Sequence, residues 1–311
     1  MAARITVVGS LNMDLVVRSP RIPQPGETII GHGFHTVPGG KGANQAIAAA
    51  RLGAQVSMVG RVGDDAFGEA LLGNLAAAGV AHAWVWRTPA TATGVALITV
   101  DDAGQNSIVV ASGANMRLTP ADVEAAEDAI AQAEVVLLQL ENPVEAVLRA
   151  AQIARARGKT VVLNPAPARP LPAELPALVD VLVPNESETA LLTGLPVADI
   201  ESAQRAALRL LESGIGTVIL TLGERGALLA HAGRSERFPA FQVTPVDTTA
   251  AGDAFVGGFA VALAEGRTLA EAVRWGNAAG GLAATQLGAQ TSLPTRAALE
   301  RLLAEGRPRS D

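Results

Sequence analysis

Short runs of aliphatic and β-branched residues alternate with longer alanine-rich stretches along most of the chain. Apolar runs of this length are typical of strands buried on both faces, and the stretches between them are long enough for crossover helices. Strands that alternate with helices predict an α/β fold with a mainly parallel sheet flanked by helices. We predict strands at 5–8, 56–59, 135–140, 160–163, 179–183 and 218–222, helices near 65–78, 119–131, 143–157 and 201–213, and a helical block from residue 254 onward.

Two stretches, residues 14–37 and 91–112, interrupt this alternation with extended runs and turn signals. The first contains the turn at 23–26, and the second contains Asp-Asp-Ala-Gly at 101–104, which is typical of a hairpin turn between strands. We predict that both stretches form one small sheet; the alternative is that their strands extend the main sheet. This prediction divides the chain into a main α/β domain of residues 1–13, 39–90 and 114–311 and a small β-sheet domain of residues 14–38 and 91–113.

Composition excludes several classes of protein. The 311-residue chain has no cysteine, which excludes disulfides and thiolate metal sites. Its net charge of −6 argues against a nucleic-acid surface. The longest apolar run is too short to cross a bilayer, and the N-terminus leads directly into a predicted strand without the layout of a signal peptide. We therefore expect a soluble, cytoplasmic protein with no nucleic-acid or membrane partner.

The segment 247–253, Asp-Thr-Thr-Ala-Ala-Gly-Asp, carries the strongest chemical signal. Small residues before Asp253 leave backbone N–H groups bare where a helix is predicted to begin, and such helix starts attract anions. A carboxylate at the same point suits a base that takes a proton from an attacking hydroxyl. The alternative, that Asp253 only caps the helix, leaves the polar residues Asp247 and Thr249 unexplained. The predicted anion hole comprises Ala250, Ala251, Gly252 and Asp253.

A second glycine-rich turn, Gly-Gly-Lys-Gly-Ala-Asn-Gln at 39–45, opens onto a predicted helix at 46–52. It is not a Walker A loop, because that motif needs Gly at the position of His35 and Ser or Thr at the position of Gly42. Lys41 is informative because the only other lysine is Lys159. A compact ammonium in a bare glycine turn suits a polyol or a phosphate. The alternative is a tight turn with a solvated lysine.

Together these two segments resemble the paired signatures of the ribokinase-like (pfkB) carbohydrate kinases, and the resemblance extends along nearly the whole chain. Within that superfamily the sequence is most similar to the ribokinases, as in the Ala-Ala-Gly-Asp form at 250–253 and in Gly-Val-Ala-Leu-Ile at 94–98. The other matching segments are Gly9-Ser-Leu-Asn12-Met-Asp14, Asn164-Pro-Ala-Pro-Ala168, Pro184-Asn185-Glu-Ser-Glu188 and Thr221-Leu-Gly-Glu-Arg-Gly226.

The resemblance implies in-line transfer of the ATP γ-phosphoryl group to the primary hydroxyl of a furanose, giving ribose 5-phosphate from D-ribose, with Asp253 as general base. Asn12 and Asp14 follow a predicted strand, where open α/β sheets place ligands, and an amide and a carboxylate suit vicinal hydroxyls. For Asn12 alone an Asx turn is the alternative. The implied sugar site consists of Asn12, Asp14, Gly39, Gly40, Lys41, Asn44, Glu141 and Asp253.

Asn185 and Glu188 match the family element Asn-x-x-Glu, which organises Mg²⁺ and the triphosphate. Mg²⁺ prefers oxygen ligands and keeps many waters, so Glu188 would hold it through water. The same spacing fits a capping box at a helix start, which is the competing interpretation. The resemblance implies a nucleotide site made of Asn185, Glu188, Thr221, Gly223, Gly252 and Asn277.

Ribokinases also hold a monovalent cation beside the anion hole, so the resemblance implies activation by K⁺. Several of the ligands would be backbone carbonyl groups. The matching positions are Asp247, Thr249, Ala283, Gln286, Gly288 and Ser292.

In ribokinases the segments that match the small sheet form a lid over the sugar, and paired lids make a homodimer. An apolar sheet face on so small an appendage needs a partner to cover it. The candidate apolar residues of this lid are Ile98, Ile108 and Val110.

The residues leave the acceptor open among ribose, 2-deoxyribose, fructose, a keto-deoxy sugar acid and a nucleoside. Asn12, Asp14 and Lys41 favour a small neutral polyol, and the chain has few aromatic residues to stack on a nucleoside base. A more distant alternative is a non-catalytic sugar or nucleotide sensor. An intact Asp253 and glycine loop argue against it, because a sensor needs no base.

Overall fold

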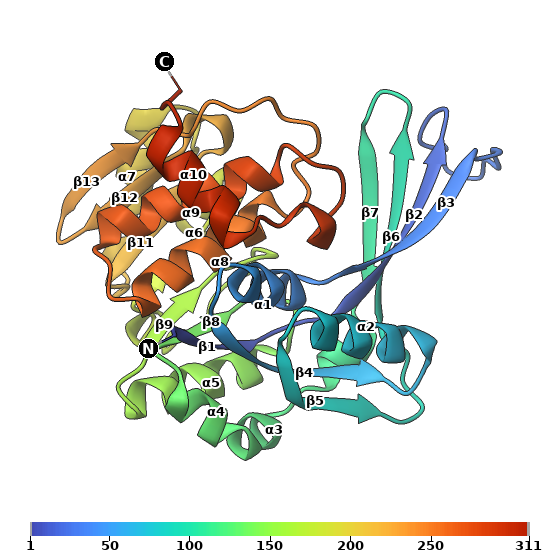
Figure 1. Cartoon of the computed structure of the whole chain (residues 1–311), viewed down its shortest axis with the longest axis horizontal. Helices are drawn as coiled ribbons and strands as arrows, with labels where there is room; N and C mark the ends of the chain where they lie inside the picture. The colour runs from blue at the N-terminus through green and yellow to red at the C-terminus, as the bar shows by residue number, and fades with distance from the viewer. Residues whose placement is uncertain (1, 310–311) are drawn as a thin grey trace.

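The computed structural model describes residues 2–309, which form two separate sheets (Figure 1). Within these residues the larger sheet has nine strands, which pair in parallel except at one edge, where β12 is antiparallel to both β11 and β13. The predicted α/β fold with a mainly parallel sheet is therefore confirmed. Across the sheet the strands are β13 (Arg234–Phe238), β12 (Ala227–His231), β11 (Thr217–Thr221), β10 (Val181–Leu182), β9 (Thr160–Leu163), β8 (Val135–Leu138), β1 (Arg4–Val8), β4 (Gln55–Gly63) and β5 (Ala81–Thr88).

Helices cover both faces of this sheet (Figure 1). Side chains of β8 alternate between the two faces: Val135 and Leu137 join the core under α8, and Val136 and Leu138 join the opposite core under α5. One face carries α1 (Lys41–Arg51), α2 (Ala66–Ala77), α8 (Ala251–Ala264), α9 (Leu269–Ala283) and α10 (Arg296–Glu305). The other carries α3 (Pro120–Ala125), α4 (Glu127–Gln132), α5 (Val144–Ala156) and α7 (Ile200–Leu211), with α6 (Glu186–Thr193) beside α7.

The observed elements differ from the predicted ones mainly at their boundaries. The strand predicted at 135–140 ends at Leu138, and the one predicted at 179–183 is only Val181–Leu182. The helix predicted near 119–131 divides at Ala126, and the helix predicted at 46–52 already begins at Lys41, inside the glycine turn. Three strands, β5, β12 and β13, were not predicted. The residues of β5 are mostly exposed or half-buried. The Ala-Leu-Leu-Ala sequence of β12 locally favours a helix.

The smaller sheet projects from the main body (Figure 1), so the alternative that its strands extend the main sheet is wrong. Its β2 starts at Asn12, two residues before the predicted stretch. The sheet is mixed, because β2 and β6 are parallel whereas the outer pairs are antiparallel. In spatial order its strands are β3 (Gly33–Gly39), β2 (Asn12–Ser19), β6 (Gly94–Asp101) and β7 (Asn106–Ala111).

Both faces of the smaller sheet expose apolar side chains. On the face that carries Asp14, Ile108 and Val110 are exposed, whereas Ile98 is half-buried. The opposite face is more apolar, and its exposed side chains are Val17, Phe34, Leu97 and Val109. No helix within residues 2–309 is long and apolar enough to cross a membrane.

Candidate active site

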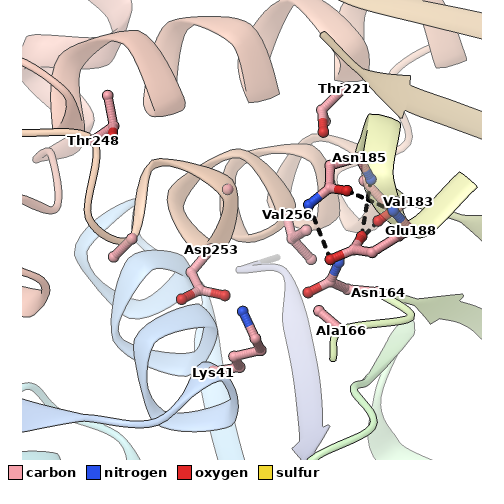
Figure 2. A pocket seen from close by; sticks show the side chains of 12 residues that line it. Lys41, Asn164, Ala166, Val183, Asn185, Glu188, Thr221, Thr248, Asp253 and Val256 are labelled. Carbon is pink, nitrogen blue, oxygen red and sulfur yellow. Dashed lines mark hydrogen bonds between the residues drawn. The ribbon is translucent and has the colours of Figure 1, made fainter. Parts of the chain in front are cut away.

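Polar side chains gather where adjacent parallel strands end. Strands β10, β9, β8 and β1 are neighbours, and the loops after them carry Asn185, Asn164, Glu141 and Ser10 respectively. Carboxyl ends of parallel strands meet at one edge of a sheet, which is where open α/β folds place ligands. A cleft of about 240 Å³ opens there, lined by Lys41, Asn164, Ala166, Val183, Asn185, Glu188, Thr221, Thr248, Ala250, Gly252, Asp253 and Val256 (Figure 2).

Asp253 lies in the first turn of α8 and is buried, with both carboxylate oxygens already bonded. The side-chain nitrogen Nδ2 of Asn44 donates to Oδ2 at 2.9 Å, and Nε2 of Gln45 donates to Oδ1 at 3.0 Å. Both donors come from α1. Figure 2 shows the amino group of Lys41 directed toward the same carboxylate.

Backbone N–H groups at the start of α8 are free to bind a ligand. Ala250 precedes the helix in the left-handed region, with φ at 58°, and the N–H of Ala251 donates to the carbonyl oxygen of Thr248 at 3.1 Å. Ala251 of the predicted anion hole is thus already engaged by a turn. Within the described chain the N–H groups of Gly252 and Asp253 make no hydrogen bond. A Cβ on Gly252 would meet no protein atom within 4 Å, so this position is open toward the cleft.

One cation and four carboxylates share this region. Burial would lower the pKa of Lys41, but the charges of Asp253, Glu141 and Glu188 outweigh it, so the pKa lies above its usual value. Burial raises the pKa of Asp14 to about 7, and the charges of Glu141 and Asp253 act in the same direction. Burial also raises the pKa of Glu188, against the hydrogen bond from the Asn185 backbone and the charge of Lys41. The site is therefore an anionic pocket with a charged lysine at its centre.

The residues expected to bind sugar lie on the side of the cleft toward the smaller sheet. Asp14 packs over Gly39, where a Cβ would lie 2.7 Å from the Asp14 carboxyl carbon. Gly40 has φ at 90°, and a Cβ there would meet the backbone nitrogen of Asn12 at 2.6 Å. Gly40 therefore needs glycine, and a side chain at Gly39 would displace the Asp14 carboxylate. This packing brings the glycine turn and the start of β2 together.

Neighbouring polar groups hold two of these residues in place. Glu141 accepts hydrogen bonds from the Ser10 hydroxyl and, at 3.1 Å, from the Lys41 backbone N–H. Asn12 is buried, and its Oδ1 accepts from Nδ2 of Asn115 at 2.7 Å. Ser10 and Asn115 were not predicted as site residues.

On the other side of the cleft, Asn185 and Glu188 form a complete capping box at the start of α6. The Glu188 N–H donates to Oδ1 of Asn185 at 2.8 Å, and the Asn185 N–H and Nδ2 donate to the Glu188 carboxylate at 2.9 and 3.0 Å. The capping interpretation is therefore correct for the local structure. The two side chains nevertheless line the cleft, so capping does not remove them from the site.

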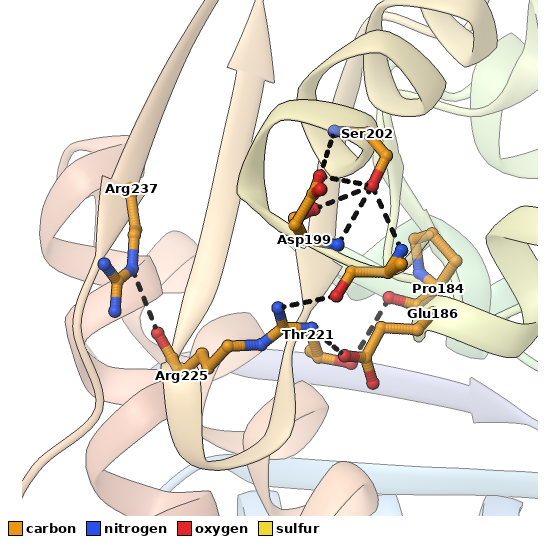
Figure 3. A network of polar contacts seen from close by, with 8 residues as sticks. Pro184, Glu186, Asp199, Ser202, Thr221, Arg225 and Arg237 are labelled. Carbon is orange, nitrogen blue, oxygen red and sulfur yellow. Dashed lines mark hydrogen bonds and ion pairs between the residues drawn. The ribbon is translucent and has the colours of Figure 1, made fainter. Parts of the chain in front are cut away.

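The turn at 223–225, after β11, is held by a polar network beside the cleft (Figure 3). Arg225 donates to the Glu186 carboxylate at 2.6 Å and to the carbonyl oxygen of Ala198 at 3.2 Å, and its own carbonyl oxygen accepts from Nε of Arg237 at 3.3 Å. Gly223 opens this turn with φ at 55°. Thr221, which lines the cleft, is thereby followed by a fixed turn.

Asn277 does not line the cleft within the described chain. Its Nδ2 donates to the carbonyl oxygens of Phe238 and Pro239 at 3.1 and 3.3 Å, which joins α9 to the segment after β13. The structure therefore gives its amide nitrogen a buried structural partner.

Three of the residues expected around a monovalent cation, Asp247, Thr249 and Gly288, are joined by hydrogen bonds. Oδ1 of Asp247 accepts from the N–H and hydroxyl of Thr249 at 2.9 and 2.6 Å, and Oδ2 accepts from the Gly288 N–H at 2.9 Å. Burial would raise the pKa of Asp247, but these hydrogen bonds lower it below its usual value. Ala283 ends α9, the N–H of Gln286 donates back to its carbonyl oxygen at 3.2 Å, and Ser292 is buried in the turn at Gln290–Ser292.

Sequence reasoning missed four amide side chains around Asp253: Gln45, Gln139, Asn164 and Gln290. A signal was present for Gln45, because an amide that precedes the apolar run at 46–50 must find a partner when it is buried. The sequence cannot say which partner.

Comparisons with known proteins find similar proteins over nearly the whole chain. The model of the pfkB family of carbohydrate kinases matches residues 2–296. The ribokinase of Haemophilus influenzae is 45% identical over 296 residues, covering 95% of this chain and 97% of that protein. A deoxyribokinase of Salmonella typhi is 38% identical, covering 94% of this chain and 95% of that protein. The structure of Arabidopsis thaliana ribokinase complexed with ribose and ATP has a TM-score of 0.89 at 36% identity, covering 97% of this chain and 99% of that one.

Proposed function

Because the chain belongs to the pfkB family of carbohydrate kinases, we propose that it transfers the γ-phosphoryl group of ATP to O5 of D-ribose. The observation that carries this proposal is the placement of Asp253. Its buried carboxylate stands beside two unpaired backbone N–H groups and a charged lysine, at the carboxyl edge of the sheet. The similarity to ribokinases at up to 45% identity supports ribose as the acceptor.

In the proposed reaction Asp253 takes the proton from O5 as O5 attacks the γ-phosphorus, and the bond from that phosphorus to the bridging oxygen of ADP breaks. The N–H groups of Gly252 and Asp253, at the positive end of α8, stabilise charge on the transferred group. Ala250 and Ala251 complete the predicted anion hole by shaping the turn. Lys41 offsets negative charge between the sugar and the phosphate.

The acceptor would lie between the glycine turn and the smaller sheet. The carboxylates of Asp14 and Glu141 accept hydrogen bonds from sugar hydroxyls, and Asn12 holds the start of β2 beside them. Gly39 and Gly40 allow the backbone to approach closely, and Asn44 stands beside the base.

ATP would occupy the side of the cleft formed by Asn185, Glu188 and Thr221. We propose that Gly223, in the turn after Thr221, and Asn277 contact the nucleotide outside the cleft lining. Magnesium would arrive with the triphosphate, where it neutralises phosphate charge. Among residues 2–309 no group of three or more His, Cys, Asp and Glu is arranged to hold a metal. Both oxygens of Glu188 already accept hydrogen bonds, which fits a water-mediated contact better than direct ligation.

We also propose that the Asp247 loop binds K⁺, with Thr249, Ala283, Gln286, Gly288 and Ser292 as partners. Support comes from the hydrogen bonds that already join Asp247 to Thr249 and Gly288. The four-stranded sheet is proposed to act as a lid and, through its exposed apolar faces, as the contact surface of a homodimer. As a consumer of ATP, the enzyme would work in the cytoplasm.

A coupled ADP-release assay tests the function directly, with Mg²⁺ and either K⁺ or Na⁺, on ribose, 2-deoxyribose, fructose, 2-keto-3-deoxygluconate and adenosine. We expect the highest kcat/KM on ribose and higher turnover in K⁺. The chain is also similar to a deoxyribokinase, so 2-deoxyribose is the main competing acceptor. A preference for 2-deoxyribose would contradict ribose as the acceptor but would be consistent with the proposed phosphoryl transfer. If the protein binds ATP but phosphorylates none of the five compounds, the non-catalytic sensor would be favoured.

A further inference from the structure

Two chains of amide side chains converge on Asp253. The first starts on α2, where Nδ2 of Asn74 donates to Oε1 of Gln290 at 2.5 Å. Nε2 of Gln290 donates to Oδ1 of Asn44 at 3.0 Å, and Nδ2 of Asn44 donates to Asp253 at 2.9 Å. This chain connects α2, the turn at Gln290–Ser292, α1 and α8.

The second chain arrives from the sheet. Nε2 of Gln139, just after β8, donates to Oε1 of Gln45 at 2.6 Å. Nε2 of Gln45 donates to Asp253 at 3.0 Å and to Oδ1 of Asn164 at 3.1 Å. Asn164 is fixed in turn, because its Nδ2 donates to the carbonyl oxygen of Val183 at 2.9 Å.

The charge of Asp253 determines the direction of the bonds that lead to it in both chains. An ionised carboxylate only accepts hydrogen bonds, so Asn44 and Gln45 must each turn their NH₂ group toward it. Their carbonyl oxygens then face away and need donors, which Gln290 and Gln139 supply. The NH₂ groups of Asn74, Gln290, Asn44, Gln139 and Gln45 therefore all donate in the direction of Asp253 along the two chains.

We infer that Gln45 is a positioning residue that holds the Asp253 carboxylate in the orientation needed for proton transfer. This inference rests on the proposed function, in which Asp253 is the base. Gln45 is fully buried and does not line the cleft within the described chain, so it acts on the substrates through the two cleft residues that it holds, Asp253 and Asn164. With one lone pair on each oxygen engaged by α1, the carboxylate cannot rotate away from the acceptor hydroxyl. A displacement of about 1 Å at a reacting group can lower a rate by about 10²-fold.

The test is Gln45→Met, which preserves length and removes the donor. We expect kcat on ribose to fall roughly 10- to 100-fold while KM for ribose and ATP stays within about 2-fold, since only alignment changes. The same exchange at the exposed Gln152 of α5 should leave both constants unchanged. Measuring Gln45→Met again in an Asp253→Asn background separates positioning from general structural damage. If Gln45 acts through the base, adding Gln45→Met to the Asp253→Asn variant should change kcat by less than about 2-fold.

Every outcome of this experiment either supports or overturns the positioning role of Gln45. Equal loss of kcat in both backgrounds, an effect on KM alone, or full activity of Gln45→Met would overturn the positioning role while leaving Asp253 as base. Near wild-type turnover of Asp253→Asn alone would instead overturn the proposed function. If Gln45→Met does not fold, Gln139→Met removes only the donor that orients Gln45, and the same pattern with a smaller loss is expected.

Discussion

A Cβ atom on Gly257 of α8 would lie 2.6 Å from the Cβ of Ala48 on α1. Asn44 and Asp253 stand one helical turn earlier on the same two helices, where Asn44 donates to the carboxylate. The close approach at Gly257 therefore allows the short side chain of Asn44 to reach the base.

Gly257→Ala should force the two helices apart. We expect it to lower the free energy of unfolding by about 1–3 kcal/mol, the usual effect of overpacking, and to reduce kcat because the bonds from α1 to Asp253 lengthen. Urea denaturation and steady-state kinetics measure the two effects. Gly73→Ala is the matched control on α2, where a Cβ meets nothing within 4 Å, and it should stabilise by up to about 1 kcal/mol. Unchanged stability of Gly257→Ala would contradict the packing argument.

Gly252→Ala should preserve the stability of the protein and lower its activity. No protein atom lies within 4 Å of the added Cβ, so the melting temperature should not fall. The methyl group would project beside the two free N–H groups at the start of α8, where the transferred phosphoryl group is proposed to bind. We therefore expect kcat/KM for ATP to drop by about 10-fold or more, by analogy with losing one donor at such a site. Wild-type kinetics in this variant would place the phosphate elsewhere.

Asp253→Asn tests the base itself. We expect kcat to fall by at least ~10²-fold, the low end for a positioned general base. Steady-state kinetics with ribose and ATP measure this loss, and circular dichroism checks the fold. Asp128→Asn, at an exposed position of α4, serves as the control and should keep full activity. Turnover near the wild-type level would remove Asp253 from the mechanism.

The pKa of Asp14, raised by burial to about 7, predicts a pH dependence of sugar binding. The ionised form accepts hydrogen bonds from hydroxyls, so KM for ribose should rise as the pH falls below about 7. Asp14→Asn should flatten this profile. KM measured from pH 5.5 to 8.5 tests it, with Asp128→Asn expected to follow the wild type.

The raised pKa of Asp14 also makes the stability of the folded protein depend on pH. Between the ordinary pKa of 3.8 and about 7, folded Asp14 holds a proton that the unfolded chain has lost. The resulting stabilisation of the ligand-free protein is present at low pH and is lost as the pH rises through about 7. Relative to the wild type, Asp14→Asn should therefore gain stability between pH 5 and pH 8. A constant difference in melting temperature over that range would argue against the raised pKa.

Leu97→Asp tests the proposed dimer surface. Leu97 is 51% exposed in β6 and lies beside Val109 on the more apolar face of the smaller sheet. A charge there should disfavour burial in a subunit interface and convert dimers to monomers, as light scattering after size-exclusion chromatography would show. Asp102→Asn, in the exposed hairpin turn of the same sheet, should leave the assembly unchanged. A monomeric wild-type protein would exclude the proposal.

Local patterns were sufficient for much of the architecture. The alternation of apolar strands and alanine-rich helices predicted the parallel sheet, and the turn at 101–104 predicted the hairpin between β6 and β7. Strand β12 was not predictable, because Ala-Leu-Leu-Ala becomes a strand only by pairing with β11. Lys41, Gly252 and Asp253 were predicted at the site because glycine turns and helix starts create anion sites locally.

The sequence by itself determined the fold class, the two segments proposed to carry the chemistry and the residue proposed as the base. These depend on periodicity, turn residues and helix ends, which are interactions between near neighbours in the chain. Only the tertiary structure decided which amides hold Asp253, that Asn277 joins α9 to the segment after β13, and that the more exposed apolar face of the smaller sheet is the one with Leu97. Those contacts join residues as far apart as 44 and 253, and they depend on how closely α1 packs on α8, which no local pattern encodes.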